Sequence, residues 1–238
     1  MNALSLLKEL DPGLQQRERK FLPEGPDARR IWALASSHLR PEHGTAEVAY
    51  SRTTYFDTPD LAYYRSCRGP VKRRLRVREY AKPGDADAPP VLADACYREL
   101  KCSTGTARTK NRVVVRPGEL AAQLAALTDA PLAPTVATWY RRRALVDDTG
   151  DLRVTLDDRL LLCRPRPVGS SFADLGEGDV LGRGPAFVLE YKCTGAPPAW
   201  LIDALTGLRE ATGFSKFQLG MYCMASAWTP TREYARAI

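Results

Sequence analysis

The stretch "VKRRLRVREY" at residues 71–80 alternates basic and apolar residues. Arg74, Arg76 and Arg78 are separated by Leu75 and Val77. Because successive side chains of a β-strand point to opposite sides, the three guanidinium groups would share one face, with apolar residues behind them. Guanidinium groups match phosphate oxygens in bidentate fashion, so this strand predicts a binding surface for phosphate groups.

Charged side chains recur at alternate positions of five further stretches. These are Glu18 with Lys20, Glu99 with Lys101 beside Tyr97, Arg142 beside Tyr140, Arg153 with Thr155 and Asp157, and Glu190 with Lys192. On any one strand such a face could simply be solvated. Repetition on six strands instead favours a barrel whose charged residues point inward and whose apolar residues face outward. Like charges packed this closely repel one another, by about 1 kcal/mol per close pair in water, and a polyanion would relieve that repulsion.

The carboxylates of this pattern allow two interpretations. Glu18, Glu99, Asp157 and Glu190 could be ion-pair partners that hold the basic side chains in place. Alternatively, one or two of them could hold Mg²⁺ or Mn²⁺, which is typically bound by one or two carboxylates together with phosphate and water. Phosphoryl transfer depends mainly on positioning and charge neutralisation, so cations and one metal ion would suffice without a covalent nucleophile.

Strand patterns dominate the elements that must position these residues. The expected strands cover residues 15–22, 47–56, 71–80, 95–103, 108–115, 135–147, 151–162 and 186–194. Helices are expected over residues 26–39, 116–128 and 198–213 and after the "FSKFQLG" motif, all packing on the outside of the sheet. Residues 81–94 and 164–185 are expected to be surface connections, the second with little core of its own. Eight mostly successive strands favour an antiparallel sheet or closed barrel, in one domain over residues 1–238.

The composition is that of an ordinary globular protein with a basic bias. The 238 residues include 35 Lys and Arg against 28 Asp and Glu, a formal net charge of +7 that favours polyanionic partners. Aromatic residues are not interleaved with the basic row as stacking platforms would be, so nucleic acid is not an expected partner. The six cysteines form no Cys-x-x-Cys pair and lie far from the two histidines, which argues against zinc and for reduced thiols in the cytoplasm. No apolar run approaches the length of a spanning helix.

In chain order, a set of motifs resembles the VTC domain, the polyphosphate polymerase domain of vacuolar transporter chaperone complexes. The motifs are "ERKF", "TTYFDTPDLAYY", "LRVREY", "RELK", "YRRRAL", "LRVTLD", "VLEYK" and "FSKFQLG", spread over about residues 15–225. VTC domains are members of the triphosphate tunnel metalloenzymes. The resemblance implies an α+β fold, in which an eight-stranded antiparallel β-barrel with flanking helices forms a tunnel for a triphosphate and a divalent metal ion.

The resemblance also implies an activity and a set of site residues. In VTC-type members, the γ-phosphate of ATP is transferred to a growing polyphosphate chain, so ATP and polyphosphate are the expected partners. The metal-binding glutamate of the family, for Mn²⁺ or Mg²⁺, falls on Glu190. The basic tunnel residues of the family fall on Lys20, Arg76, Arg78, Lys101, Arg142 and Lys216, and further inward charged positions are Arg74, Arg153 and Lys192.

Two positions depart from the family pattern. Gly213 replaces a basic residue that some eukaryotic members carry, and Gln16 replaces the first glutamate of the Glu-x-Glu-x-Lys motif of CYTH members. The second departure favours the polymerase branch over the cyclases and thiamine triphosphatases. Two other functions fit the same pattern: a hydrolase of tripolyphosphate or nucleoside triphosphates, and a non-catalytic module that binds polyphosphate or inositol phosphates. A membrane partner is among the candidate recipients of the product.

Overall fold

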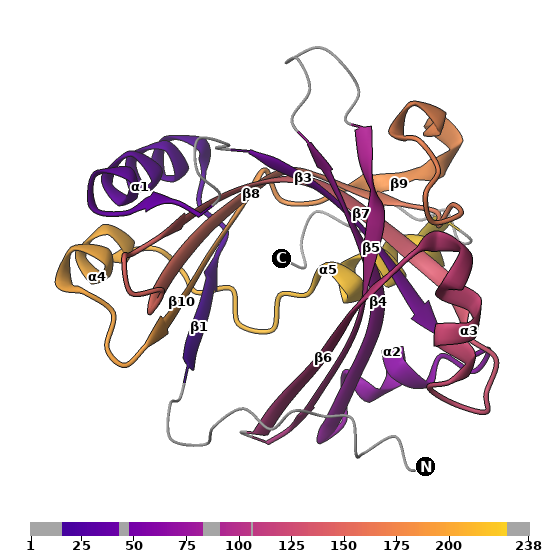
Figure 1. Cartoon of the computed structure of the whole chain (residues 1–238). Helices are drawn as coiled ribbons and strands as arrows, with labels where there is room; N and C mark the ends of the chain where they lie inside the picture. The colour runs from indigo at the N-terminus through magenta and orange to yellow at the C-terminus, as the bar shows by residue number, and fades with distance from the viewer. Residues whose placement is uncertain (1–15, 43–47, 83–90, 106, 228–238) are drawn as a thin grey trace.

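The computed structural model describes residues 16–42, 48–82, 91–105 and 107–227. Eight long strands form one curled antiparallel sheet in the order β1-β10-β8-β7-β3-β4-β5-β6. Two short strands extend it: β2 (Arg40–Pro41) pairs with β7, and β9 (Val180–Arg183) pairs with β8. The expected α+β fold, an antiparallel barrel-like sheet with flanking helices, is confirmed in the form of a half-barrel (Figure 1).

All eight expected long strands are present. They are β1 (Gln16–Phe21), β3 (Ala49–Asp57), β4 (Val71–Lys82), β5 (Val91–Thr104), β6 (Ala107–Val115), β7 (Ala133–Val146), β8 (Leu152–Cys163) and β10 (Phe187–Thr194). The prediction of a connection over residues 81–94 was too long, because β4 continues to residue 82 and β5 begins at residue 91. The remaining residues 83–90 lie outside the described part of the chain.

One wall of the half-barrel consists of β1, β10 and β8, with helices on its convex side. The helices are α1 (Gly25–His38) and α4 (Ala199–Leu205), so the helix expected over residues 198–213 is shorter than predicted. Ile31 and Ala35 of α1 are fully buried against Leu156 and Leu189 of the sheet. The apolar alternate residues of these strands therefore face outward to helices, as the pattern predicts.

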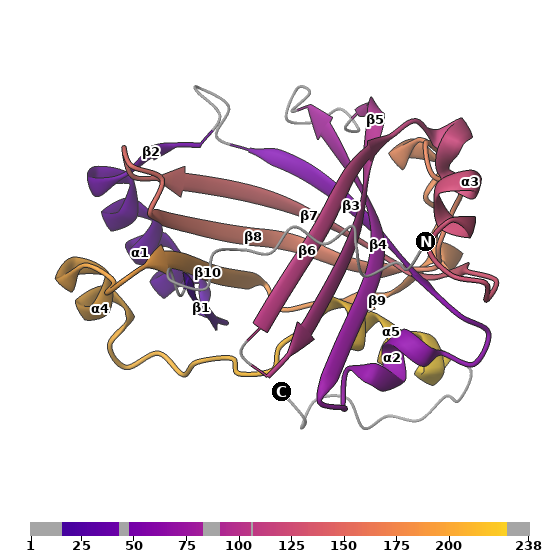
Figure 2. The same ribbon diagram turned by 60° about the horizontal axis from the view of Figure 1, so that its bottom comes forward.

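The other wall consists of β4, β5 and β6, and the two walls cross steeply in Figure 2. A 3₁₀ turn (Pro117–Glu119) and α3 (Leu120–Ala125) cover its convex side, where Leu120 and Leu124 pack on Leu75 and Val77. The short helix α2 (Ala62–Ser66) follows β3. Asp57 accepts hydrogen bonds from two backbone amides of α2, each at 2.8 Å, and so caps the start of this helix.

The excursion over residues 164–185 is anchored to the sheet by a few contacts. It contains two 3₁₀ turns (Phe172–Asp174 and Glu177–Asp179) and ends in β9. Phe172 packs edge-on against Trp139 at 4.5 Å, and the Gly169 amide donates a hydrogen bond of 2.7 Å to the buried Glu79. The excursion therefore has little core of its own, as predicted, because its aromatic and buried polar partners belong to the sheet.

Helix α5 (Lys216–Ala227) lies against the concave side of the sheet, which corrects its assignment as outer packing. Its Phe217 stacks on Tyr55 at 4.7 Å, and Leu219 packs near Leu160. The approach is close, because a Cβ at Gly220 would lie 2.8 Å from a methyl group of Val136. The concave side is therefore apolar where α5 packs and charged elsewhere.

A local irregularity of β8 separates the charged part of the concave side from the apolar part. Arg159 has a φ of 53°, and the register between β7 and β8 shifts nearby. Before this point Leu152, Val154 and Leu156 face outward, whereas after it Leu160 and Leu162 pack with Tyr140 on the concave side. One strand thus supplies charge to one part of the interior and leucines to another.

The two edges of the sheet approach each other without a backbone ladder among the residues described here. Arg108 of β6 and Glu18 of β1 form an ion pair of 3.7 Å between these edges.

In the described segments, none of the helices has the length and apolar character required to cross a membrane.

Candidate functional site

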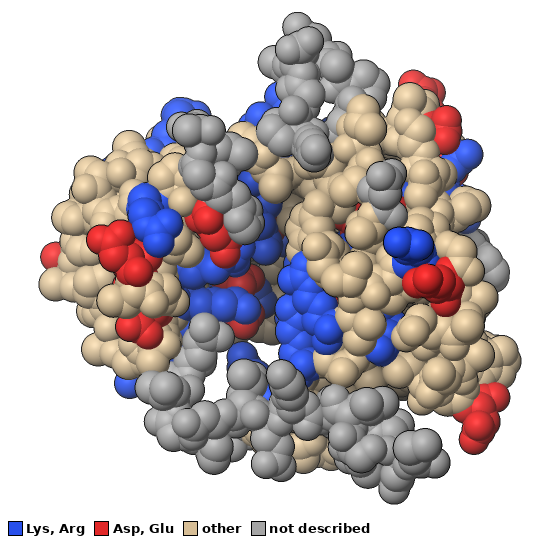
Figure 3. All heavy atoms as spheres, in the orientation of Figure 1, with Lys and Arg blue, Asp and Glu red and all other residues tan. Residues whose placement is uncertain are grey.

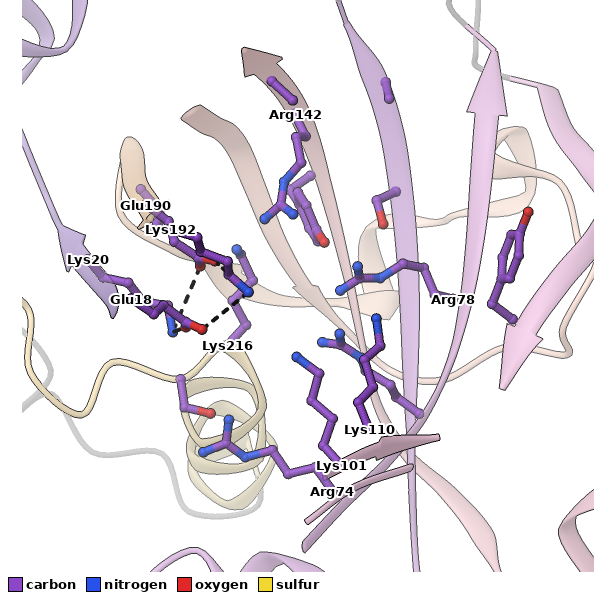
Figure 4. A pocket seen from close by; sticks show the side chains of 18 of the residues that line it. Glu18, Lys20, Arg74, Arg78, Lys101, Lys110, Arg142, Glu190, Lys192 and Lys216 are labelled. Atoms are coloured by element: carbon purple, nitrogen blue, oxygen red, sulfur yellow. Dashed lines mark ion pairs between the residues drawn. The ribbon is translucent and has the colours of Figure 1, made fainter. Parts of the chain in front are cut away.

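A cavity of about 720 Å³ lies within the curled sheet. Eleven Lys and Arg side chains line it, against three glutamates. Figure 3 shows the basic atoms in the hollow between the two walls, and Figure 4 shows their side chains pointing toward one another across it. The site residues that the family resemblance implies all lie in the lining, namely Lys20, Arg74, Arg76, Arg78, Lys101, Arg142, Arg153, Glu190, Lys192 and Lys216.

The arginine row of β4 faces the cavity. Arg74, Arg76 and Arg78 line it, while Leu75 and Val77 are almost completely buried on the opposite face. Within the described segments, Arg74, Arg78 and Lys101 have no carboxylate partner within 4.0 Å. Their charges are held together by the strand pairing, which places Arg74 opposite Lys101. The row is thus suited to an anion that enters from outside.

Glu99 lies beneath the same wall and does not reach the cavity. Its carboxylate is 0% exposed and lies 2.6 Å from the Arg76 guanidinium and 3.0 Å from Lys110 Nζ. Burial opposes ionisation of this group, but the neighbouring cations, Arg76 first, hold the pKa of Glu99 well below its usual range. Glu99 is therefore an ion-pair partner that positions the wall.

Asp157 plays the same part on the opposite side. It is 2% exposed and accepts two hydrogen bonds from the Arg142 guanidinium, at 2.6 and 2.7 Å. Lys216 Nζ, at the start of α5, lies 2.5 Å from the same carboxylate. Although burial acts against the charged form, Arg142 and Lys216 keep the pKa of Asp157 well below its usual range. Asp157 thereby fixes two cations from different elements at one point of the cavity.

Glu18 and Glu190 differ from Glu99 and Asp157 because they reach the cavity. Lys20 Nζ lies 2.8 Å from Glu18 and 3.9 Å from Glu190, and Lys192 Nζ lies 3.2 Å and 3.5 Å from the same two carboxylates. Figure 4 shows this group of four. Burial acts to raise the pKa of Glu18, but Lys192 and Lys20 lower it to about 2.

The donor set fits a divalent ion that is bound together with phosphate. No group of three or more His, Cys, Asp or Glu residues able to hold a metal occurs in the described part of the chain. Mg²⁺ and Mn²⁺ are commonly held by one or two carboxylates, with phosphate and water oxygens completing the coordination. Glu190 and Glu18 are adjacent carboxylates that supply such a partial set.

The crowding of charge has two marked consequences for protonation. Repulsion from Arg76, followed by burial and by repulsion from Lys192, lowers the pKa of Lys101 to about 6. Burial would raise the pKa of the Tyr140 hydroxyl, but Arg78, Arg142 and Lys216 lower it to about 7. Tyr140 is only 3% exposed, and Lys216 Nζ lies 4.3 Å from its ring centroid. Both groups are thus poised to take up a proton when an anion neutralises the cations around them.

Several lining residues were not predicted from the sequence. These are Lys110 and Arg112 of β6, Tyr80 of β4, Glu42 and Ser215. The two cations carry the same signal as β4, because Arg108, Lys110 and Arg112 alternate in the "RTKNRVVV" strand. Glu42 gave no such signal. It binds Arg153 through two contacts of 2.6 and 2.7 Å that join residues distant in the chain.

Gly213 has a structural reason for departing from the family pattern. Its φ is 81°, in the left-handed region that favours glycine. A basic residue at this position would strain the turn that leads through Phe214 and Ser215 to Lys216.

The family model of the VTC domain matches residues 119–225, so the resemblance expected from the sequence is confirmed over this range. This match supports a function related to polyphosphate or triphosphate. No curated protein matches the chain.

Among solved structures, a candidate adenylate cyclase from Bacillus halodurans is 16% identical, covering 76% of this chain and 83% of its own, with a TM-score of 0.45. A candidate adenylyl cyclase from Hippeastrum, described as revealing a dominant triphosphatase activity, is 14% identical, covering 86% and 94% respectively, with a TM-score of 0.45. The PH1012 protein of Pyrococcus horikoshii is 13% identical, covering 80% and 87%, with a TM-score of 0.42.

Proposed function

We propose that the protein is a metal-dependent polyphosphate polymerase, which transfers the γ-phosphate of ATP to a growing polyphosphate chain inside the cavity. The observation that carries the proposal is the lining of one cavity by eleven basic side chains and only three glutamates. A row of phosphate groups would neutralise cations that the fold holds together from seven strands and one helix. The match to the VTC domain supports polyphosphate as the anion that this cavity binds.

The basic residues would bind and orient the phosphates. In the proposed reaction an oxygen of the terminal phosphate of the chain attacks the γ-phosphorus of ATP. A new P–O bond forms, the bond to the β–γ bridging oxygen breaks, and ADP leaves with that electron pair. Lys20, Arg76, Arg78, Lys101, Arg142 and Lys216 would hold the reacting phosphates in line, and Arg74, Arg153 and Lys192 would extend the basic surface.

Glu190, with Glu18 beside it, would hold Mn²⁺ or Mg²⁺ together with the phosphates. When bound, the ion would supply charge neutralisation at the transferring phosphate. Lys20 and Lys192 lie between the two carboxylates, so these lysines can exchange their carboxylate partners for phosphate oxygens as the ion binds.

Incubation of the pure protein with ATP and Mn²⁺, followed by gel electrophoresis and ³¹P NMR, tests the proposal. Long phosphate chains that are lost in Glu190→Ala and Arg76→Ala, but not in Lys72→Met, would establish the polymerase. Lys72 is the matched control because it is exposed on the same strand as Arg76 and lies outside the cavity. Orthophosphate without chains would show that water is the nucleophile and that the protein is a hydrolase. Tight polyphosphate binding without turnover would contradict an enzymatic function altogether.

The expected cytoplasmic setting belongs to this proposal. All six cysteines are free thiols in the structure, which supports a reducing compartment.

A further inference from the structure

Two aromatic side chains in the cavity wall have no packing role in the core. The aromatic residues that line the cavity are Tyr55, Tyr80, Tyr97, Tyr140 and Phe214. Tyr55 stacks on Phe217, and Tyr140 packs with leucines and Phe214. In contrast, Tyr80 and Tyr97 are half-buried and belong to none of the hydrophobic clusters formed by the described residues. Their aromatic surface is therefore available to something other than the core.

Tyr80 and Tyr97 lie at one end of the arginine row. Tyr80 occupies the inward position of β4 after Arg78, and Tyr97 lies opposite Arg78 on β5. The register with β3 places Arg76 beside Tyr55, which contacts α5, and places Tyr80 farther from that helix. Inward residues from 74 to 78 span about 13 Å, since a strand rises about 3.3 Å per residue. A row of phosphate-binding cations thus ends directly at two aromatic rings.

The two rings and one guanidinium form a compact π-surface. The ring centroids of Tyr80 and Tyr97 are 5.5 Å apart, with an interplanar angle of 73°. The Arg112 guanidinium carbon lies 3.9 Å from the Tyr97 centroid and 5.7 Å from that of Tyr80. Arg112 also donates a hydrogen bond of 3.3 Å to the Tyr80 hydroxyl and approaches Glu99 at 3.6 Å. Aromatic faces and guanidinium planes are the groups on which nucleobases stack.

We infer that Tyr80, Tyr97 and Arg112 form a stacking subsite for the base of a nucleoside triphosphate. Its phosphates extend from Arg78 along the row toward Arg74, so the base marks the tyrosine end and the γ-phosphate lies toward Arg74. This inference rests on the proposed function and adds to it the orientation of the nucleotide. Every base has a π-face, so the subsite distinguishes nucleoside triphosphates from inorganic polyphosphate and does not select one base.

The test compares the binding of ATP and of inorganic tripolyphosphate by calorimetry in EDTA, where turnover is suppressed. Both probes present three linked phosphates, but only ATP has a base. Tyr80→Leu and Tyr97→Leu should each weaken ATP binding about 5- to 30-fold, while tripolyphosphate binding changes less than about twofold. The double variant Tyr80→Phe/Tyr97→Phe keeps both rings and should bind ATP within about twofold of the unmodified protein.

Tyr222→Leu is the matched control, because Tyr222 is an exposed tyrosine of α5 outside the cavity. This variant should bind both probes as the unmodified protein does. Equal losses for ATP and tripolyphosphate in the leucine variants would overturn the inference alone, since the rings would then only position Arg112. Unchanged ATP binding in both leucine variants would overturn it as well. Failure of the unmodified protein to bind either probe would overturn the proposed function together with the inference.

Discussion

Binding of a polyanion should be accompanied by proton uptake at Lys101. Arg76, Lys192 and Lys110 surround this amine, and its pKa is lowered from 10.5 to about 6. At pH 8 a group with that pKa is about 1% protonated. A bound phosphate chain would neutralise the surrounding cations and return the pKa toward its ordinary value. Lys101 should then take up about one proton for each chain bound.

Tyr140 should contribute a second proton. Its pKa of about 7 leaves the hydroxyl about 90% ionised at pH 8, because three cations favour the anion. When phosphate oxygens bind those cations, the phenolate loses its stabilisation and is protonated. The unmodified protein should therefore take up about two protons at pH 8, apart from protons exchanged by the phosphate chain itself. Affinity should fall as pH rises above about 6, since binding consumes protons.

Calorimetric titration with tripolyphosphate in EDTA measures the effect directly. The observed enthalpy is compared between Tris and HEPES buffers at pH 8, and its dependence on the buffer's ionisation enthalpy gives the number of protons bound. Lys101→Met should lower that number by about one, and Tyr140→Phe by about one. Lys72→Met, at an exposed lysine outside the cavity, should leave it unchanged. If Lys101→Met takes up as many protons as the unmodified protein, Lys101 is already charged before the anion binds and the reasoning is wrong.

Three further measurements of stability test charged side chains of the barrel. Asp157→Asn leaves Arg142 and Lys216 unpaired and should lower the free energy of unfolding by about 3–5 kcal/mol in urea titrations. An unchanged midpoint of urea unfolding would show that the two cations need no counter-ion. Arg98 is only 5% exposed, and two of its guanidinium nitrogens have no hydrogen-bond partner in the described structure. Arg98→Met should therefore raise the free energy of unfolding by on the order of 1 kcal/mol. A loss of stability in thermal unfolding would contradict this. The pKa of Glu18 is lowered from 4.5 to about 2, so its contribution to stability is present above about pH 4.5 and is lost as the pH falls toward 2. Urea titrations between pH 7 and pH 3 should show this decline, and Glu18→Gln should reduce its slope.

Local alternation made much of the site predictable. In a strand that is buried on one face, apolar and charged residues alternate along the sequence. Arg76 and Leu75 could therefore be assigned to opposite faces without knowledge of any partner strand. The same periodicity identified the eight long strands to within a few residues at most ends. It would also have identified Lys110 and Arg112, whose alternation was present in the sequence and was not used.

Other features depended on contacts between distant parts of the chain. Glu18, Glu99, Asp157 and Glu190 all occur in the same alternating pattern of charged residues. Of these four carboxylates, only Glu18 and Glu190 reach the cavity. The difference arises because neighbouring cations cover Glu99 and Asp157, and those cations come from other strands and from α5. The spacing of residues within one strand cannot show which cations from other elements cover a carboxylate.

The amino-acid sequence by itself determined the strands, their charged faces and a basic interior suited to phosphate. Only the tertiary structure decided that the sheet curls without a backbone ladder between β1 and β6 in the described segments, and that α5 packs inside the curl. It also placed two tyrosines at the end of the arginine row. The physical reason is that side-chain alternation is a local property with a period of two residues, whereas curvature, strand order and the position of α5 depend on pairing and packing between residues far apart in the chain.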